Sequence, residues 1–163
     1  MRTAGQKGND LLGQAVEAFK LALQVRTREQ LPQDWAATQN NLGTVLRTQG
    51  ERTDGQEGND LLAQAVEAFK LALQVYTRDQ FPQYWAVTQN NLGNVLMDQG
   101  VRTAGQKGND LLGQAVKAYK QALQVRTREQ LPQDWAMTQN NLDAVLKVLG
   151  ERTSAQKVLR DPQ

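Results

Sequence analysis

The apolar residues near the start of the chain follow the spacing of an amphipathic helix. They recur at i, i+3, i+4 and i+7 and form one stripe, which consists of Leu12, Ala15, Val16, Phe19, Ala22 and Leu23. Two residues just before this stripe, Asn9 and Asp10, have side chains that can cap a helix N-terminus. The pattern predicts a first helix from Leu11 to about Thr27.

A second helix is predicted from Pro32 to about Gln49. Pro32 suits the first turn of a helix, and Asp34 would face the positive end of the helix dipole. Gly50 follows the last helical position, where glycine commonly ends a helix. The core-facing side of this helix consists of Trp35, Thr38, Leu42, Val45 and Leu46. The two helices are therefore expected to form an antiparallel pair.

This pattern occurs three times, because residues 1–50, 51–100 and 101–150 align without a gap. A repeat of this length is typical of stacked helical units. We expect six helices of roughly 25 Å each at 1.5 Å per residue, joined alternately by a short proline turn and a longer glycine-rich loop. One helix pair cannot bury its stripe alone, so the sequence predicts an all-α solenoid domain of three helix-turn-helix repeats. Residues 151–163 are expected to form a C-terminal capping tail, with a short helix that Ser154 caps.

Parts of each copy resemble the tetratricopeptide repeat (TPR) family. The residues that follow the family motif are Leu42, Gly43, Leu46, Gly50, Ala65, Phe69 and Ala72, and then Leu92, Gly93, Leu96, Gly100, Ala115, Tyr119 and Ala122. The segment VRTREQLPQDWAATQNNLG is similar to the kinesin light chain type of repeat, expanded here from about thirty-four residues to fifty. The resemblance implies a right-handed solenoid whose inner helices line a concave groove that binds peptides.

The second helix of each repeat also has a side that faces away from its core-facing residues. Most positions that differ among the copies lie on this side. The variable positions that we select as candidates for partner binding are Ala37, Val87 and Met137, then Thr44 and Asn94, then Arg47, Met97 and Lys147. Two interpretations are open. A solvated surface tolerates substitution after duplication, whereas a binding groove would be adjusted copy by copy.

Two adjacent asparagines on or beside this side do not vary among the copies. They are Asn40, Asn41, Asn90, Asn91, Asn140 and Asn141. Asparagine inside a helix costs up to about 0.7 kcal/mol relative to alanine. Because an amide offers both a donor and an acceptor, these side chains suit binding to the main chain of an extended peptide, as the TPR resemblance also implies. The alternative is that one asparagine of each pair bonds a neighbouring helix or loop. Asn41 is the better ligand candidate, and Asn40 fits either role.

Composition argues against several other functions. The chain has no Cys and no His, which removes thiolate and imidazole metal ligands, cysteine nucleophiles and the commonest general base. No recurring acidic pair suits acid–base catalysis, so we expect neither an enzyme nor a cofactor. A formal net charge of +2 gives little support to nucleic-acid binding. No apolar run reaches the ~18 residues of a membrane helix, and no signal peptide is evident, so a cytoplasmic location is expected.

Three further motifs receive structural interpretations. The tryptophans near the start of each second helix, Trp35, Trp85 and Trp135, are expected to be core anchors. The Gly-x-x-Gly segments are expected to be turns. Arginines near the ends of the first helices, such as Arg126, are expected to complement the helix dipole.

Together these observations predict a non-catalytic scaffold that binds a peptide or protein segment. A structural module that associates with itself is the alternative, and nucleic-acid binding is a weaker one. Asp143 replaces the Gly43 and Gly93 of the earlier copies, which places a carboxylate where close helix contact is otherwise allowed. With the capping tail, this substitution predicts a monomer or a weak homodimer.

Overall fold

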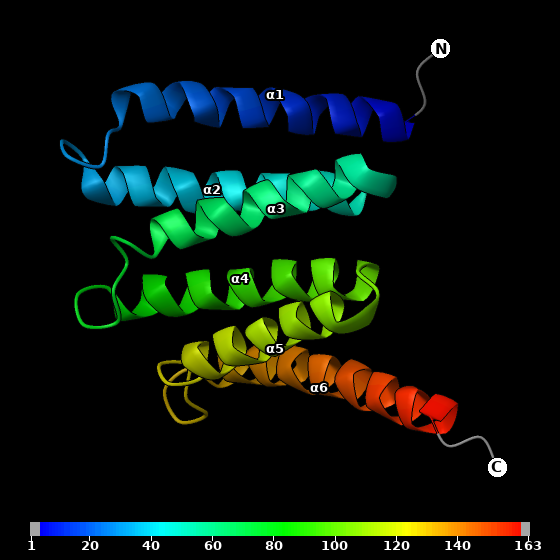
Figure 1. The fold of residues 1–163 in the computed structure, drawn as a ribbon. Helices are drawn as coiled ribbons and strands as arrows, with labels where there is room; N and C mark the ends of the chain where they lie inside the picture. The colour runs from blue at the N-terminus through cyan, green and yellow to red at the C-terminus, as the bar shows by residue number, and fades with distance from the viewer. Residues whose placement is uncertain (1–3, 161–163) are drawn as a thin grey trace.

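Helices account for most of residues 4–160, the part of the chain that the computed structural model describes. Their bounds are α1 (Ala4–Val25), α2 (Pro32–Glu51), α3 (Gly55–Ala72), α4 (Pro82–Arg102), α5 (Gly105–Ala122) and α6 (Pro132–Arg160). No strand occurs within these residues, so the all-α prediction is confirmed. The helices are stacked in chain order, and the two termini lie at opposite ends of the stack (Figure 1).

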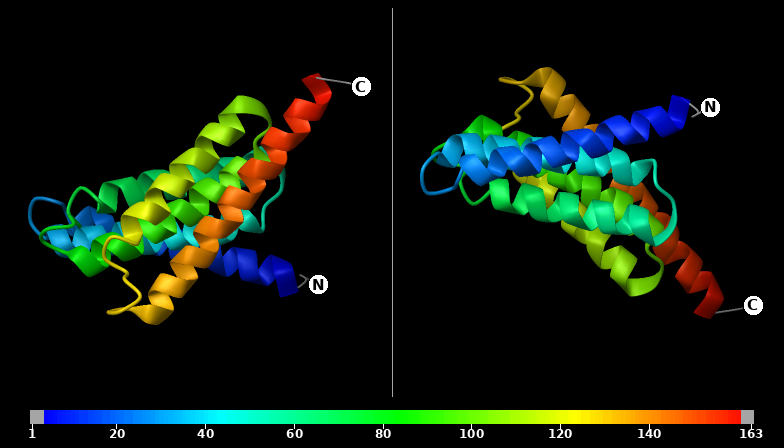
Figure 2. Two further views of the ribbon diagram at one scale, coloured as in Figure 1. Left: turned by 90° about the horizontal axis from the view of Figure 1, so that it is seen from below. Right: turned by 90° about the horizontal axis from the view of Figure 1, so that it is seen from above.

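Each helix packs against the next one along the chain, most extensively in the pairs α2–α3 and α4–α5. In addition α2 contacts α4 and α4 contacts α6, whereas the backbones of α1, α3 and α5 stay apart from one another. We therefore call α2, α4 and α6 the inner helices and α1, α3 and α5 the outer helices. The helix directions rotate along the stack, so that α1 and α6 cross at a steep angle (Figure 2). This packing is consistent with a helical repeat.

The main hydrophobic core runs along the stack between inner and outer helices. Its fully buried side chains include Leu62, Phe69, Val95, Leu112 and Tyr119. A second cluster lies near the ends of the helices that border the proline-containing connections, and it consists of Ala36, Ala72, Tyr76, Trp85, Ala86 and Ala122. Because Trp35 packs against this cluster, the expected anchor role is confirmed for Trp35 and Trp85. Trp135 is half-buried, and the guanidinium carbon of Arg128 lies 5.6 Å from its ring centre.

The prediction of a long glycine-rich loop before each outer helix is wrong. Residues 52–54 alone separate α2 from α3, and the Gly-x-x-Gly segments form the first turns of α3 and α5. Asn9 and Asp10 accordingly lie inside α1, which begins at Ala4 and not at Leu11. The longer connections are those that lead to the proline at the start of an inner helix, such as residues 73–81 between α3 and α4.

Glycine residues make this short turn possible, because they have no side chain. Gly55 and Gly105 have φ angles of +69° and +67°, in a region that residues with a side chain rarely adopt. A Cβ atom at Gly58 would lie 1.9 Å from the carbonyl oxygen of Thr53. The chain can therefore reverse within residues 52–54 and begin the outer helix at once.

Gly50 and Gly100 do not end the inner helices, contrary to the prediction, since α2 continues to Glu51 and α4 to Arg102. A Cβ atom at Gly50 would lie 3.0 Å from Leu62 Cδ2, and one at Gly100 would lie 2.8 Å from Leu112 Cδ2. These two glycines thus allow an outer helix to approach the inner helix that precedes it.

The prediction of a separate short helix after Gly150 is also wrong, because α6 runs unbroken to Arg160. Ser154 Oγ donates a hydrogen bond to the Gly150 carbonyl oxygen at 3.0 Å, as a residue inside a helix does, and does not cap a new one. The two turn glycines of the earlier copies are replaced here by Ala155 and Val158. Without glycine the reversal is disfavoured, and the helix continues.

Candidate interaction face

The inner helices share one side that the outer helices do not cover. We define the inner-helix face as three sets of equivalent residues, namely Ala37, Asn41 and Thr44 of α2, Val87, Asn91 and Asn94 of α4, and Met137, Asn141 and Ala144 of α6. Within each set the residues are three or four positions apart and therefore lie along one side of a helix. All nine are exposed or half-buried. The face brings together residues that are about a repeat apart in the sequence.

One column of the inner-helix face is apolar. Val87 is 38% exposed and Met137 is 45% exposed, whereas Ala37 is half-buried. The side chains at this position grow from alanine through valine to methionine along the stack. This column offers a partner apolar contact area that differs from repeat to repeat.

The first asparagine of the pair connects successive inner helices. The Thr88 hydroxyl lies 3.2 Å from Asn40 Oδ1 and 2.8 Å from the Tyr84 carbonyl oxygen, between which it shares its proton. At the next junction the Thr138 hydroxyl lies 3.1 Å from Asn90 Oδ1, and Asn90 is only 3% exposed. Asn40 and Asn90 therefore make the structural contact that the sequence left open.

The second asparagine of the pair is differently placed. Asn41 is exposed and Asn91 is half-buried, and neither side chain has a hydrogen bond within the described residues. Asn141 Nδ2 instead donates to Asn94 Oδ1 at 3.1 Å and to Asn90 Oδ1 at 3.5 Å. In α6, Asn140 is exposed at the position where Asn40 and Asn90 bond the next inner helix. Amides free to bind a ligand are therefore those of Asn41, Asn91 and Asn140.

Two of the variable positions lie in contacts between repeats. Arg47 Nε donates to Asp98 Oδ2 at 2.6 Å, which joins α2 to α4, and Arg47 Nη2 lies 2.7 Å from Glu51 Oε1. Asn94 Oδ1 accepts a hydrogen bond from the Tyr119 hydroxyl at 2.8 Å. Both side chains therefore already make contacts within the protein, which leaves fewer of their polar atoms available to a ligand.

The positions of Arg47 and Asp98 carry apolar side chains at the next junction. The equivalent positions there are Met97 and Val148, which are half-buried and pack against the main core. Lys147, which is equivalent to Arg47 and Met97 in the third repeat, is exposed. Variation at these positions is therefore paired across repeats, a signal that comparison of single columns missed.

Two arginines that sequence reasoning did not select join the C-terminal ends of successive inner helices, which lie side by side. Arg102 Nη1 donates to the Gly50 carbonyl oxygen at 2.9 Å, and its Nη2 donates to that of Glu51 at 3.0 Å. Arg152 makes the equivalent bonds to Gly100 and Val101, at 3.0 and 3.1 Å. Each guanidinium satisfies carbonyls at a helix C-terminus, where a cation is also favourable. The Arg-Thr dipeptide at the same position of every copy was the available signal.

Arg126 has a different role from the one predicted. Since α5 ends at Ala122, Arg126 lies beyond the helix, and it is buried. Its Nη1 donates to the Thr138 hydroxyl at 2.9 Å, and its Nη2 lies 4.0 Å from Asp134 Oδ1. Burial lowers the pKa of this guanidinium, partly offset by Asp134. The residue ties the connection after α5 to the start of α6.

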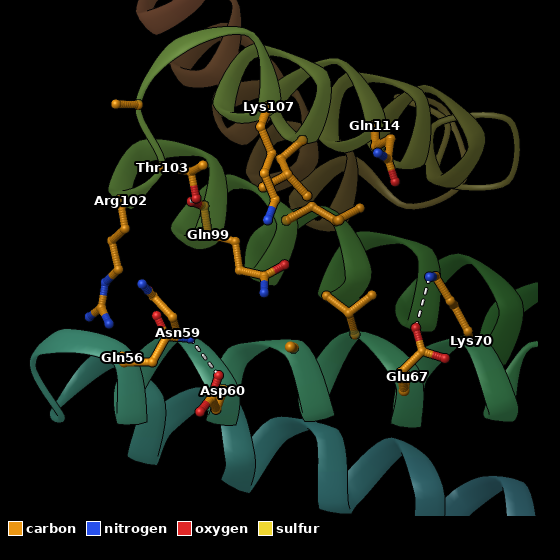
Figure 3. A pocket seen from close by; sticks show the side chains of 15 residues that line it. Gln56, Asn59, Asp60, Glu67, Lys70, Gln99, Arg102, Thr103, Lys107 and Gln114 are labelled. Atoms are coloured by element: carbon orange, nitrogen blue, oxygen red, sulfur yellow. Dashed lines mark hydrogen bonds and ion pairs between the residues drawn. The ribbon is translucent and has the colours of Figure 1, made fainter.

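The most voluminous of the clefts described lies on the opposite side of the stack, between the outer helices α3 and α5. Its volume is about 650 Å³, and α4 forms its floor. Figure 3 shows Gln99, Lys107 and Gln114 around the cleft, with the Glu67–Lys70 ion pair along α3. Its charges are mixed in sign. We refer to it as the outer cleft, and no sequence pattern predicted it.

The described residues contain neither a candidate membrane span nor a candidate metal site. No helix among them has an apolar stretch long enough to span a lipid bilayer. Their acidic side chains form no group of three that would hold a metal ion. Comparison of the chain with protein-family models, curated proteins and solved structures finds no match.

Proposed function

We propose that the protein is a non-catalytic interaction scaffold that binds an extended peptide or protein segment on the inner-helix face. The observation that carries this proposal is the combination of unbonded amides and exposed apolar side chains on neighbouring inner helices. Asn41 and Asn91 have no hydrogen bond within the described residues, and Val87 and Met137 are exposed beside them.

The two kinds of side chain have separate tasks in this proposal. An amide that accepts from and donates to the ligand main chain binds any sequence. The column of Ala37, Val87 and Met137 contacts ligand side chains and supplies selectivity, since its size differs in each repeat. Asn40 and Asn90 position the helices, because their side chains bond the next inner helix.

The proposal includes membership of the TPR family and a right-handed solenoid with a concave inner side. The contact between the two halves of the resembling motif supports it. A Cβ atom at Gly43 would lie 2.9 Å from Phe69 Cζ, so the glycine of one motif half accommodates the aromatic ring of the other. The same relation joins Gly93 to Tyr119, at 2.6 Å from its Cε1 atom. A cytoplasmic location without a cofactor belongs to the same proposal.

Selection from a random peptide library displayed on phage tests the proposed function. Peptides are selected on the full chain, and their affinities are then measured for a face variant that carries Asn41→Ala, Asn91→Ala and Met137→Ala. We expect the face variant to bind selected peptides at least about tenfold more weakly, the equivalent of 1.4 kcal/mol. A matched control with Lys107→Ala and Gln114→Ala alters the outer cleft and should bind normally. Failure to select peptides, or equal binding by the face variant, would contradict the proposal.

A further inference from the structure

One side of the outer helix α1 is exposed to solvent, whereas the equivalent side of α3 and of α5 is buried. Ala18 is exposed, whereas the equivalent Ala68 and Ala118 are 4% and 2% exposed. The residues of α1 that match those packed against an inner helix in α3 and α5 are Leu12, Ala15, Ala18 and Ala22, with Phe19 in place of Phe69 and Tyr119. The exposed side of α1 therefore fits an inner helix of the kind that precedes α3 and α5.

The inner helix α6 has the complementary uncovered side. Leu146 is 45% exposed, whereas Leu46 and Leu96 are 2% and 4% exposed beneath the outer helix that follows them. The residues of α6 that are identical to those of α2 and α4 on this side are Ala136, Gln139, Leu142, Leu146 and Gly150. Two residues of α6 differ where the other inner helices meet the aromatic ring of the next outer helix: Asp143 replaces Gly43 and Gly93, and Ala144 replaces Asn94, which accepts a hydrogen bond from Tyr119.

The position of Asp143 is the one that receives an aromatic ring inside the stack. A Cβ atom at Gly43 would lie 2.9 to 3.1 Å from three ring carbons of Phe69, and one at Gly93 would lie 2.6 to 2.9 Å from those of Tyr119. Real Cβ atoms essentially never come closer than 3.0 Å to such neighbours. Asp143 adds a Cβ atom and a carboxylate there, and its Oδ1 accepts a hydrogen bond from Gln139 Nε2 at 2.9 Å.

We propose that Asp143 prevents a second copy of the chain from docking its α1 on α6. The occupant is a second copy because α1 repeats the side chains that α3 and α5 use at the two internal examples of this interface. The α6 side shares Ala136, Gln139, Leu142, Leu146 and Gly150 with those examples. The contact would be head-to-tail, and such contacts generate open chains unless the rotation closes. Overlap with the aromatic ring and burial of the Asp143 carboxylate both oppose it.

Two chains with complementary blocked ends test this inference. The first chain carries Asp143→Gly, which opens its α6 side, and Ala18→Glu, which places a charge on its α1 side. The second chain is the parent, whose α1 side is open and whose α6 side carries Asp143. We expect each chain alone to be monomeric by light scattering, and an equimolar mixture to form a complex of about twice the monomer mass. Asp143→Gly without the second change should form chains that lengthen with concentration.

The controls separate docking from misfolding. Ala18→Glu alone, mixed with the parent, should remain monomeric, and far-ultraviolet circular dichroism should show unchanged helix content. If Asp143→Gly lowers the helix content, Gly113→Ala is added to restore helix stability, because its Cβ atom meets nothing within 4 Å and Asp143→Gly still removes the overlap with the ring. A mixture that stays monomeric at millimolar concentration, or a parent that already forms chains, overturns the proposal.

Discussion

The two asparagines of each pair differ in their burial and in their hydrogen bonds to the next inner helix. Asn90 is buried and accepts from Thr138, whereas Asn41 is exposed and has no hydrogen bond within the described residues. A buried hydrogen bond contributes about 0.5–1.5 kcal/mol net when its partners keep other bonds, as the Thr138 hydroxyl keeps the Asp134 carbonyl oxygen. An exposed asparagine inside a helix can be replaced at no such cost.

The first prediction compares these two residues. Asn90→Ala should lower the free energy of unfolding by about 0.5–1.5 kcal/mol, the net value of a lost hydrogen bond, because Thr138 and Asn141 each lose Asn90 but keep Asp134 and Asn94 as partners. Asn41→Ala should leave it unchanged or raise it by up to about 0.7 kcal/mol, since alanine is the better helix former. Urea unfolding measures both. A larger loss for Asn41→Ala than for Asn90→Ala would reverse the roles assigned here.

The second prediction concerns the paired variation at the junctions. Replacing Arg47 by Met and Asp98 by Val copies the apolar pair of the next junction, Met97 and Val148. The free energy of unfolding of the double variant should lie within about 0.5 kcal/mol of that of the parent. Arg47→Met alone should lower it further, because Asp98 then loses its charged partner. Since both side chains are partly solvated, the coupling should not exceed about 1 kcal/mol. Strictly additive changes would show that the two positions are independent.

A third prediction follows from the buried Tyr119 hydroxyl. Burial, and to a lesser extent the nearby Asp98, raises its pKa above the ordinary value of 10.0. The unfolded chain therefore releases this proton first, so stability is unaffected below pH 10 and falls as the pH rises above it.

The matched variant for this prediction is Tyr119→Phe, which copies the residue found at Phe69. Its free energy of unfolding should be lower by about 1 kcal/mol at neutral pH through loss of the bond to Asn94. Its decline above pH 10 should be shallower than that of the parent, although Tyr76, whose pKa burial also raises, retains part of the slope. Parallel declines in alkaline urea titrations would count against this assignment.

At the scale of the element, glycine decides whether a helix reverses or continues. Gly55 and Gly58 permit the turn between α2 and α3, and their replacement by Ala155 and Val158 accompanies the unbroken α6. Other glycines have no such task. A Cβ atom at Gly113 would meet nothing within 4 Å, and the equivalent residue in α3 is Ala63.

The fourth prediction uses this contrast. Gly58→Ala should destabilise the protein by more than about 2 kcal/mol, because its Cβ atom would overlap the Thr53 carbonyl oxygen in the tight turn. Gly113→Ala should raise the free energy of unfolding by about 0.5–1 kcal/mol through helix propensity alone. Thermal unfolding ranks the two variants, and a stable Gly58→Ala protein would mean that the turn relaxes easily.

At the scale of the whole molecule, apolar periodicity and the repeat were sufficient to predict six helices in three pairs. They did not predict the connections, because clustered glycines favour turns in general, whereas here they start a helix immediately. The roles of Arg47 and Arg102 were not predicted either, because both residues bond atoms of another repeat. Such contacts depend on how the repeats stack, and the sequence of a single repeat does not specify this. The candidate face was predicted in outline, but Asn40 and Asn90 could be assigned to the fold only once their neighbours across the junction were known.

At the same scale, the two sides of the stack differ in the side chains that they expose. The inner-helix face offers equivalent side chains in consecutive repeats, which suits a ligand that extends along the stack. The outer cleft has a volume of about 650 Å³, and its lining mixes charges of both signs. Both sides are accessible to solvent, so the location of the bound ligand distinguishes the proposed function from its nearest competitor.

Amide chemical-shift mapping by NMR locates it directly. The ¹⁵N-labelled full chain is titrated with the tightest-binding library peptide, and shifts are followed for the backbone and for the asparagine side-chain amides. The proposed function predicts that the largest changes fall on Asn41, Val87, Asn91 and Met137, including the side-chain amides of both asparagines. Changes concentrated instead on Gln56, Lys107 and Gln114 of the outer cleft would contradict it.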